Sequence, residues 1–298
     1  MLGYPHNLFV LPFDHRSSLI KMFFGEVKEI SQSQRKIMED YRMLIFDGFY
    51  EAYKKLKNKN ELAILVDEEF SSSVLKKAKK KGVTTCLSTE KSGSNVFDFA
   101  YGKDFPNHIK KFDHPIVKAL VRYNPANKKD NLTQLKRLKL LSDWCHQNDY
   151  KFMIEPLVPA TKMDLKKLNG CQDLYDKNRR PALARKMISE MHIAGVEPDI
   201  WKIEAFEAKK DWEAIIAEAR KGEERQEVAI ICLGRGESFA KVKDWFSIAP
   251  REKLNGFAVG RTVFLRAVEE FHTRKINRKE AIHIIAKNYS ELVKYWRK

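Results

Sequence analysis

The sequence has few cysteines and no long apolar run, and these absences exclude several classes of protein. Its cysteines, Cys86, Cys145, Cys171 and Cys232, lie far apart and form no C-x-x-C pair, which disfavours a disulfide framework and a cysteine-ligated zinc site. No apolar segment is long enough to span a bilayer, and the first residues lack the basic flank and cleavage site of a signal peptide. We therefore expect a protein of the reducing cytoplasm, without membrane contact.

The chain also lacks an obvious internal boundary. No stretch rich in Pro, Gly or Ser divides the 298 residues, and no short repeat is visible. No G-x-G-x-x-G turn follows the first apolar run, which disfavours an open dinucleotide-binding sheet. With 43% hydrophobic residues the chain can bury one large core, so we expect a single domain over residues 1–298.

Short β-type runs alternate along the chain with longer segments of helical periodicity. The expected strands are Leu8–Phe13, Ala63–Val66, Thr84–Ser88, Ile116–Arg122, Phe152–Leu157, Asp199–Glu204, Val228–Leu233 and Gly256–Val259. The clearest helices are Gln34–Lys55, Ser72–Lys80, Asn131–Gln147, Ala182–Ala194, Asp211–Arg220, Ser238–Trp245 and Ala281–Trp296, whereas Ser92–Phe112 gives no clear pattern. This alternation predicts an α/β fold, a single parallel (β/α)8 (TIM) barrel.

The formal charge of +16 raises nucleic-acid binding as an alternative, because Lys and Arg can neutralise phosphates. The lysines, however, occur in short clusters on or beside many predicted helices, as solvated helix faces do. No zinc finger, helix-turn-helix or RNA-recognition aromatic motif accompanies them. Nucleic acid is therefore a disfavoured partner.

Ionisable residues interrupt several of the predicted strands, where such residues are costly unless they are paired or functional. Lys118, Glu155 and Lys202 are embedded in apolar runs, while Asp14 ends the first strand and Glu90 follows the third. Each alone could be a solvated strand-end charge. Two lysines and a carboxylate on three consecutive strands instead indicate a catalytic site.

These residue types suit Schiff-base chemistry. Strand alternation places Lys202 inside the barrel if Trp201 faces the helices. A lysine attacks a carbonyl only as the free amine, so burial or a nearby cation must lower the ordinary lysine pKa of about 10.4, and Lys118 is the candidate cation. Glu155 is the candidate proton shuttle. A protonated imine withdraws electrons as a metal ion would, so this chemistry needs no metal. A metal site would need several histidines near strand ends, but only His15 follows a strand, so we expect neither metal nor cofactor.

Gly-Arg pairs follow the last two predicted strands. Gly234 and Arg235 come after the seventh strand, and Gly260 and Arg261 come after the eighth, where a helix begins. Barrels often bind phosphate at these strand exits through glycine backbone N–H groups, a helix N-terminus and an arginine fork. Ordinary turn glycines with exposed arginines are the alternative.

At these residues the sequence resembles the domain fused behind the kinase in some bacterial 5-dehydro-2-deoxygluconokinases of myo-inositol catabolism. The stretches that carry the resemblance are Leu11–Arg16, Val66–Phe70, Glu90–Gly93, Val117–Pro125, Ala194–Glu204 and Gly256–Thr262. That domain is similar in turn to class I tagatose-1,6-bisphosphate aldolases. The resemblance implies that Lys202 forms the Schiff base and that Lys118 is the second active-site lysine. It also implies that Glu155 is the acid/base and that Asp14 is a catalytic aspartate.

The motifs further suggest that Glu90, Arg16, Arg122 and Glu204 bind substrate. The resemblance implies an aldolase acting on a phosphorylated keto sugar or sugar acid. Its inositol context suggests 2-deoxy-5-keto-gluconate 6-phosphate, cleaved to dihydroxyacetone phosphate and malonate semialdehyde. The 298 residues contain no counterpart of the kinase half, which leaves this substrate open.

Two other functions stay open at this stage. One is a different sugar-phosphate lyase or isomerase on the same barrel, because a fold does not fix a function. The other is a non-catalytic basic protein that binds phosphorylated ligands or nucleic acid. The sequence also leaves open the aldehyde product, the stereochemistry and the oligomeric state, a homo-oligomer included.

Overall fold

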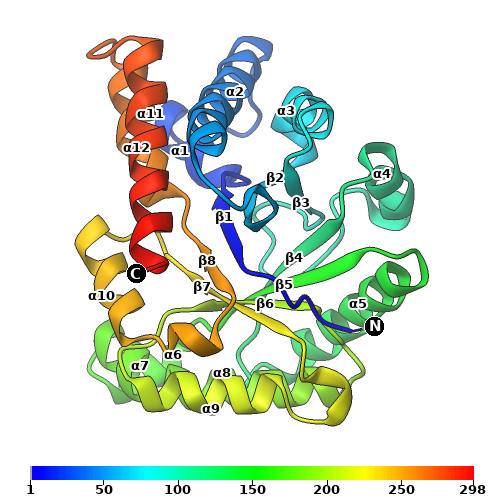
Figure 1. The fold of residues 1–298 in the computed structure, drawn as a ribbon. Helices are drawn as coiled ribbons and strands as arrows, with labels where there is room; N and C mark the ends of the chain where they lie inside the picture. Colours follow the sequence, from blue (N-terminus) through cyan, green and yellow to red (C-terminus); the bar gives the residue numbers. More distant parts are fainter. Residues whose placement is uncertain (1) are drawn as a thin grey trace.

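The strands form a closed barrel in the computed structural model, which describes residues 2–298 (Figure 1). Each strand pairs in parallel with its neighbours in chain order, and β8 pairs with β1. The strands are β1 Leu8–Pro12, β2 Leu62–Val66, β3 Thr84–Ser88, β4 Ile116–Arg122, β5 Lys151–Leu157, β6 Ile200–Glu204, β7 Ala229–Leu233 and β8 Gly256–Ala258. The predicted single parallel (β/α)8 barrel is confirmed, and no predicted strand end differs by more than one residue.

Helices surround this barrel (Figure 1). They are α1 Ser17–Phe24, α2 Gln32–Lys55, α3 Glu68–Lys80, α4 Phe105–Phe112, α5 Lys128–Gln147, α6 Lys162–Lys167, α7 Gln172–Asn178, α8 Arg180–Ile193, α9 Lys209–Ala219, α10 Phe239–Ile248, α11 Arg261–His272 and α12 Arg278–Trp296. Short 3-10 turns are η1 Lys59–Glu61, η2 Gly102–Asp104, η3 Glu223–Arg225 and η4 Arg251–Lys253. None of the helices within residues 2–298 has both the length and the apolar content that a bilayer-spanning helix needs.

The strand side chains divide into two apolar layers, because alternate residues of a strand point to opposite faces. One cluster fills the barrel interior and includes Val10, Ile116, Met153 and Ile200. The other lies between the strands and the helices and includes Trp201. On β4, β5 and β6 the inner cluster holds only the early inward positions, Ile116, Met153 and Ile200, so the later inward positions of these strands are left for other side chains.

Close packing of α2 against α12 closes the barrel wall over β1. Gly48 of α2 lies under Ile285 of α12, and a Cβ added to Gly48 would approach the Ile285 side chain to 2.6 Å. The hydroxyl of Tyr289, also on α12, donates a hydrogen bond of 2.5 Å to the carbonyl oxygen of Phe9. The last helix therefore fixes the strand whose end carries Asp14.

The sequence pattern did not reveal α1, α4, α6 and α7. These helices have 6 to 8 residues, too short for two full amphipathic turns to show as a period. The predicted start of α3 at Ser72 was also wrong. The helix begins at Glu68, capped by Asp67, and continues through a kink at Ser71. The acidic Glu68-Glu69 pair masked this start because it interrupts the apolar pattern.

Candidate active site

The inward positions near the strand ends bring the predicted catalytic residues together. Ile200 belongs to the inner cluster and Trp201 to the outer one, so strand alternation directs Lys202 and Glu204 into the barrel, as predicted. The same alternation directs Lys118 inward on β4 and Glu155 inward on β5, two residues after the inner-cluster members of those strands. All four side chains are buried.

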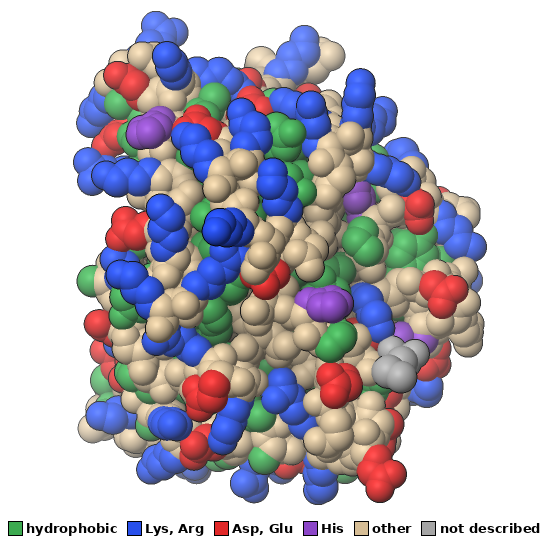
Figure 2. Space-filling view, viewed as in Figure 1, with side chains coloured by type: hydrophobic (Ala, Val, Ile, Leu, Met, Phe, Trp, Pro, Cys, Tyr) green, Lys and Arg blue, Asp and Glu red, His purple; other side chains and the backbone are tan. Residues whose placement is uncertain are grey.

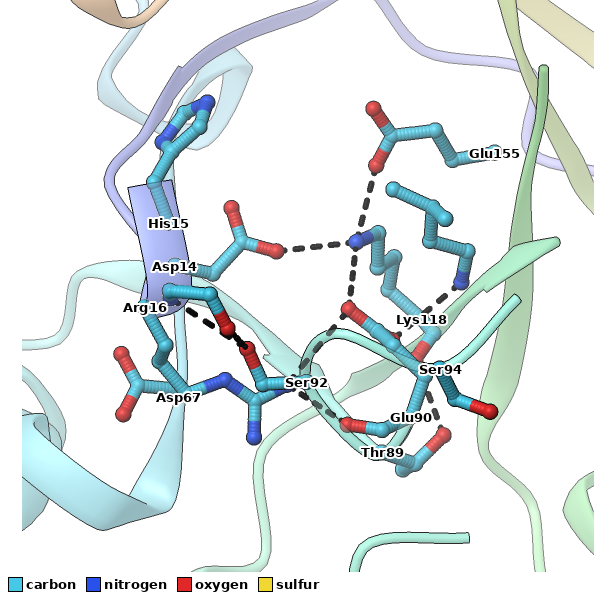
Figure 3. A network of polar contacts seen from close by, with 12 residues as sticks. Asp14, His15, Arg16, Asp67, Thr89, Glu90, Ser92, Ser94, Lys118 and Glu155 are labelled. Carbon is cyan, nitrogen blue, oxygen red and sulfur yellow. Dashed lines mark hydrogen bonds and ion pairs between the residues drawn. The ribbon is translucent and has the colours of Figure 1, made fainter. Parts of the chain in front are cut away.

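Lys118 lies at the centre of the polar network in Figure 3. Its Nζ is 2.8 Å from Asp14 Oδ2, 2.9 Å from Glu90 Oε1 and 2.8 Å from Glu155 Oε2. Burial alone would lower the pKa of Lys118, but Asp14, Glu155 and Glu90 outweigh it and hold that pKa well above its usual range. Lys118 is therefore a fixed cation.

Lys202 has a different environment. Its Nζ is 2.8 Å from Glu155 Oε1, and this is its one ion pair within residues 2–298. The side chain also lines a cavity of about 370 Å³, whereas Lys118 does not. One lysine is thus locked by three carboxylates, and the other has a single carboxylate and access to open space.

Glu155 connects the two lysines, since each of its oxygens forms an ion pair with one ammonium group. Burial opposes its charged form, but Lys118 and Lys202 dominate and lower the pKa of Glu155. The pKa of Asp14 is lowered for the same reasons, with burial opposing and Lys118 prevailing. Both carboxylates therefore stay ionised in the resting site.

Two cavities meet at Glu155. One, of about 260 Å³, extends over the β1 and β3 ends and is lined by Arg16 and Glu90; the other, of about 370 Å³, extends over the β6 to β8 ends. The residues that line both are His15, Ser18, Leu120, Arg122 and Glu155. A substrate that fills both cavities would place its middle at Glu155.

The predicted substrate-binding residues are placed around these cavities. Arg16 donates from Nη2 to the Glu90 carbonyl oxygen at 2.6 Å and lies 3.8 Å from Glu90 Oε1, so it is joined to the central network. Arg122 is exposed and donates to the Ser94 carbonyl oxygen at 3.1 Å. The Lys202-side cavity contains Glu204, whose Oε2 accepts from the Val158 backbone N–H at 3.1 Å.

The two Gly-Arg pairs differ from each other. Arg235 is paired with Asp176 of α7 at 2.7 Å and with Glu204 at 3.4 Å. Arg261 instead donates from Nη2 to the Arg235 carbonyl oxygen at 2.8 Å, and its Nε is buried without a hydrogen-bond partner among the described residues. Of the two arginines, Arg261 has more capacity left for an anion.

The glycines beside these arginines permit close approach. Gly234 lies against Val259, and a Cβ on Gly260 would come within 2.1 Å of the Pro12 carbonyl oxygen. Gly260, Arg261 and Gly236 all line the larger cavity, and α11 begins at Arg261. The N-terminus of α11 and an arginine thus border the same space, an arrangement suited to an anion.

Within residues 2–298, no group of three or more His, Cys, Asp and Glu side chains is arranged to hold a metal ion. The three carboxylates at the strand ends instead meet on the ammonium group of Lys118. His108, His146 and His192 lie in helices and His114 in a loop, as predicted. The chain thus supplies its own cation at the centre of the site.

Positive charge is dispersed over the outside of the molecule. Figure 2 shows Lys and Arg side chains over the whole visible face, with Asp and Glu between them. A hollow of about 460 Å³ between α2 and α12 is larger than either cavity at the strand ends, but it contains none of the predicted site residues. It is lined by lysines such as Lys55, Lys287 and Lys294 together with Glu51 and Glu291.

Sequence analysis missed three contributions to the site. Asp176 lies on the short helix α7, where no pattern connected it with Arg235. Arg42 of α2 forms a fully buried pair with Asp67 at 3.1 Å and donates to the His15 carbonyl oxygen at 2.7 Å. The sequence places Arg42 on the apolar face of a helix, and this unusual position could have identified it. His15 was considered only as a metal ligand, although it lines both cavities.

The fold is shared with several solved structures. A fructose-bisphosphate aldolase from Plasmodium falciparum superposes with a TM-score of 0.65 at 11% identity, covering 98% of this chain and 90% of that one. Cgl0159 from Corynebacterium glutamicum gives 0.55 at 15% identity, covering 96% and 86%. The YdjI aldolase from Escherichia coli K12 gives 0.51 at 13% identity, covering 99% and 97%. At such identities the likeness concerns the fold.

No curated protein matches the chain significantly in sequence. A family model does match it from residue 4 to residue 298, almost its whole length. The chain belongs to that family, which is described as "Uncharacterized protein conserved in bacteria (DUF2090)".

Proposed function

We propose that the protein is a metal-independent, Schiff-base aldolase, a carbon-carbon lyase in which Lys202 is the nucleophilic amine. The observation that carries this proposal is the contrast between two buried lysines on one carboxylate. Lys118 is held as an ammonium by Asp14, Glu90 and Glu155, whereas Lys202 forms one ion pair within residues 2–298, with Glu155, and borders a cavity. The amine that can meet a carbonyl is therefore Lys202.

The contacts of Glu155 suit the steps of imine formation. An amine attacks only as the free base, and Glu155 Oε1, 2.8 Å from Lys202 Nζ, can take the ammonium proton. The same carboxyl can then protonate the departing hydroxyl of the carbinolamine, so that water leaves. Lys118 steadies the other Glu155 oxygen throughout, because its own charge is fixed.

The charge of the network favours the protonated imine. Asp14, Glu90 and Glu155 carry three negative charges, and Lys118 and Arg16 carry two positive ones, which leaves one negative charge. A protonated imine on Lys202 carries the same positive charge as the ammonium that it replaces beside Glu155, so it keeps the network balanced, whereas a neutral imine would not. Fixed charges that match a reaction intermediate stabilise it without reorganisation. The imine can then accept the electrons of the breaking C–C bond.

The substrate that we propose is a phosphorylated keto sugar or sugar acid. Gly260 and the N-terminus of α11 border the cavity that contains Lys202, and Arg261 has spare donor capacity there. The resemblance to the fused domain supports 2-deoxy-5-keto-gluconate 6-phosphate as the first compound to assay. Three of the similar structures are named as aldolases, two of them fructose-bisphosphate aldolases, which supports a lyase at the level of the fold.

The proposal is tested by trapping the imine. The protein is incubated with dihydroxyacetone phosphate and sodium borohydride, and the reduced adduct is located by peptide mass spectrometry. We expect the adduct on Lys202, none in Lys202→Ala, and an unchanged yield in Lys209→Ala, which alters a lysine at the start of α9 outside both cavities. No adduct on the folded native protein would refute a Schiff base with this ketone and favour another lyase or isomerase.

A further inference from the structure

Aldol cleavage needs proton transfer at two places, and Glu155 is placed to serve one of them. Its Oε1 is occupied by Lys202 and its Oε2 by Lys118, both at 2.8 Å. Proton transfer at the Lys202 nitrogen uses the first contact. The hydroxyl that must lose its proton belongs to the other half of the substrate, beyond the bond that breaks, and a second base there could take this proton while Glu155 stays with Lys202.

The two cavities limit the candidates for this base. Among the five residues that line both, Leu120 has no polar side chain, Ser18 offers only a hydroxyl and Arg122 carries donors without an acceptor. His15 is the remaining group besides Glu155. Asp14 lines only the smaller cavity and is engaged by Lys118. His15 alone combines free basic capacity with a position at the junction.

The His15 ring is held in place but is not saturated. Its carbonyl oxygen accepts from Arg42, which is fixed by Asp67, and its ring packs edge-on against Phe264 at 6.3 Å between centroids. Its Nδ1 is buried, and no hydrogen-bond partner for it exists within residues 2–298. In Figure 3 the ring extends away from the Asp14 carboxylate. A buried nitrogen without a hydrogen-bond partner costs free energy unless a bound ligand supplies that partner.

The ring is also in the protonation state that a base needs. Burial lowers the pKa of His15 to about 4; Asp14 opposes this shift and Arg261 adds to it. The imidazole is therefore neutral at pH 7. Its basicity is similar to that of the carboxylates that serve as bases in many enzymes.

We propose that His15 is a second catalytic residue, the base that takes the hydroxyl proton when the C–C bond breaks; this inference rests on the proposed aldolase function. The proton moves from the hydroxyl to an imidazole nitrogen, and the O–H electrons form the aldehyde carbonyl. The C–C electrons move into the protonated imine and give an enamine. The imidazolium then returns its proton to the enamine carbon, and water releases the ketone from Lys202.

The probe for this step is dihydroxyacetone phosphate alone, because reversible enamine formation exchanges a hydrogen of its hydroxymethyl carbon with the solvent. The exchange is followed by proton NMR in D2O, in parallel with borohydride trapping. In His15→Gln and His15→Phe we expect exchange roughly 100-fold slower, a typical loss for a general base, with the Lys202 adduct still formed. His283→Gln, which alters an exposed histidine of α12 that lines neither strand-end cavity, is the matched control and should exchange at the native rate.

The outcomes separate this inference from the proposed function. An adduct with near-native exchange in both His15 variants would overturn the role of His15 alone. Loss of the adduct in those variants would also overturn it, because His15 would then act in imine formation. A native protein that forms the adduct without exchanging hydrogen would overturn it as well. No adduct on the native protein would remove the aldolase proposal, and this inference with it.

Discussion

Replacing Lys118 with methionine removes the cation on which three carboxylates meet, while keeping a side chain of similar length. Glu155 would retain Lys202 at 2.8 Å, and Glu90 would retain Arg16 at 3.8 Å. Asp14 would lose its only ion-pair partner within residues 2–298. We expect Asp14 to take up a proton in the folded variant, because an unpaired carboxylate is not tolerated at a buried position.

The free energy of unfolding should fall by an amount set by that proton. Protonating at pH 7 a carboxyl whose unfolded pKa is about 3.9 costs about 4 kcal/mol, at 1.36 kcal/mol per pH unit. Removal of one partner from a buried ion pair typically costs about 3–5 kcal/mol, in agreement. For 298 residues, with an unfolding entropy of about 2.1 cal/mol/K per residue, this corresponds to a Tm lower by about 6 °C.

The pH dependence has a definite sign. In the native protein the pKa of Asp14 is lowered, so its contribution is present above the unfolded pKa and is lost as the pH falls. In Lys118→Met the pKa of Asp14 is raised above the unfolded value, so the variant loses stability as the pH rises from about 4. Between pH 5 and pH 7 the difference between the two proteins should therefore grow by about 3 kcal/mol.

Urea unfolding at pH 5 and pH 7 measures this difference. Lys202→Met is the matched comparison, because Glu155 keeps Lys118 and the loss should be about 2 kcal/mol without that pH dependence. A Lys118→Met variant as stable as Lys202→Met, or one whose deficit shrinks as the pH rises, would show that Lys118 is not the central cation.

Three further substitutions test the surrounding structure. Asp67→Asn keeps the cap on α3 but leaves Arg42 buried without a counter-charge, so the free energy of unfolding should fall by about 3–5 kcal/mol, measured by urea titration. Burial lowers the pKa of His114 to about 4, so the native protein should lose stability as the pH falls from about 6.5. In acid unfolding curves, His114→Gln should reduce this loss by about 1.4 kcal/mol per pH unit. Gly48→Ala should cost about 1–3 kcal/mol by thermal melting, because its Cβ would meet Ile285; an unchanged Tm would show that α12 can shift.

The sequence contained enough to predict the barrel and the members of the central network, and the reason is periodicity. Apolar runs mark strands, and a charge inside such a run, as at Lys118 or Lys202, stands out by its cost. Periodicity does not tell these two lysines apart, because each points inward two residues after the start of its strand. Their difference arises from Asp14 and Glu90, which reach Lys118 from β1 and from beyond β3. Such contacts depend on the closure of the barrel, which no local pattern encodes.

The same limit explains the two Gly-Arg pairs, which look alike in the sequence. Arg235 has a left-handed backbone, with φ of 52°, a conformation that costs about 1–3 kcal/mol for a residue other than glycine and persists only where its surroundings impose it. Asp176 and Glu204 hold its side chain, and its carbonyl oxygen accepts from Arg261. Arg235 is thus a scaffold that aims Arg261 at the cavity. If phosphate binds there, Arg235→Lys should weaken binding by misplacing Arg261, because lysine lacks the planar fork that reaches both carboxylates.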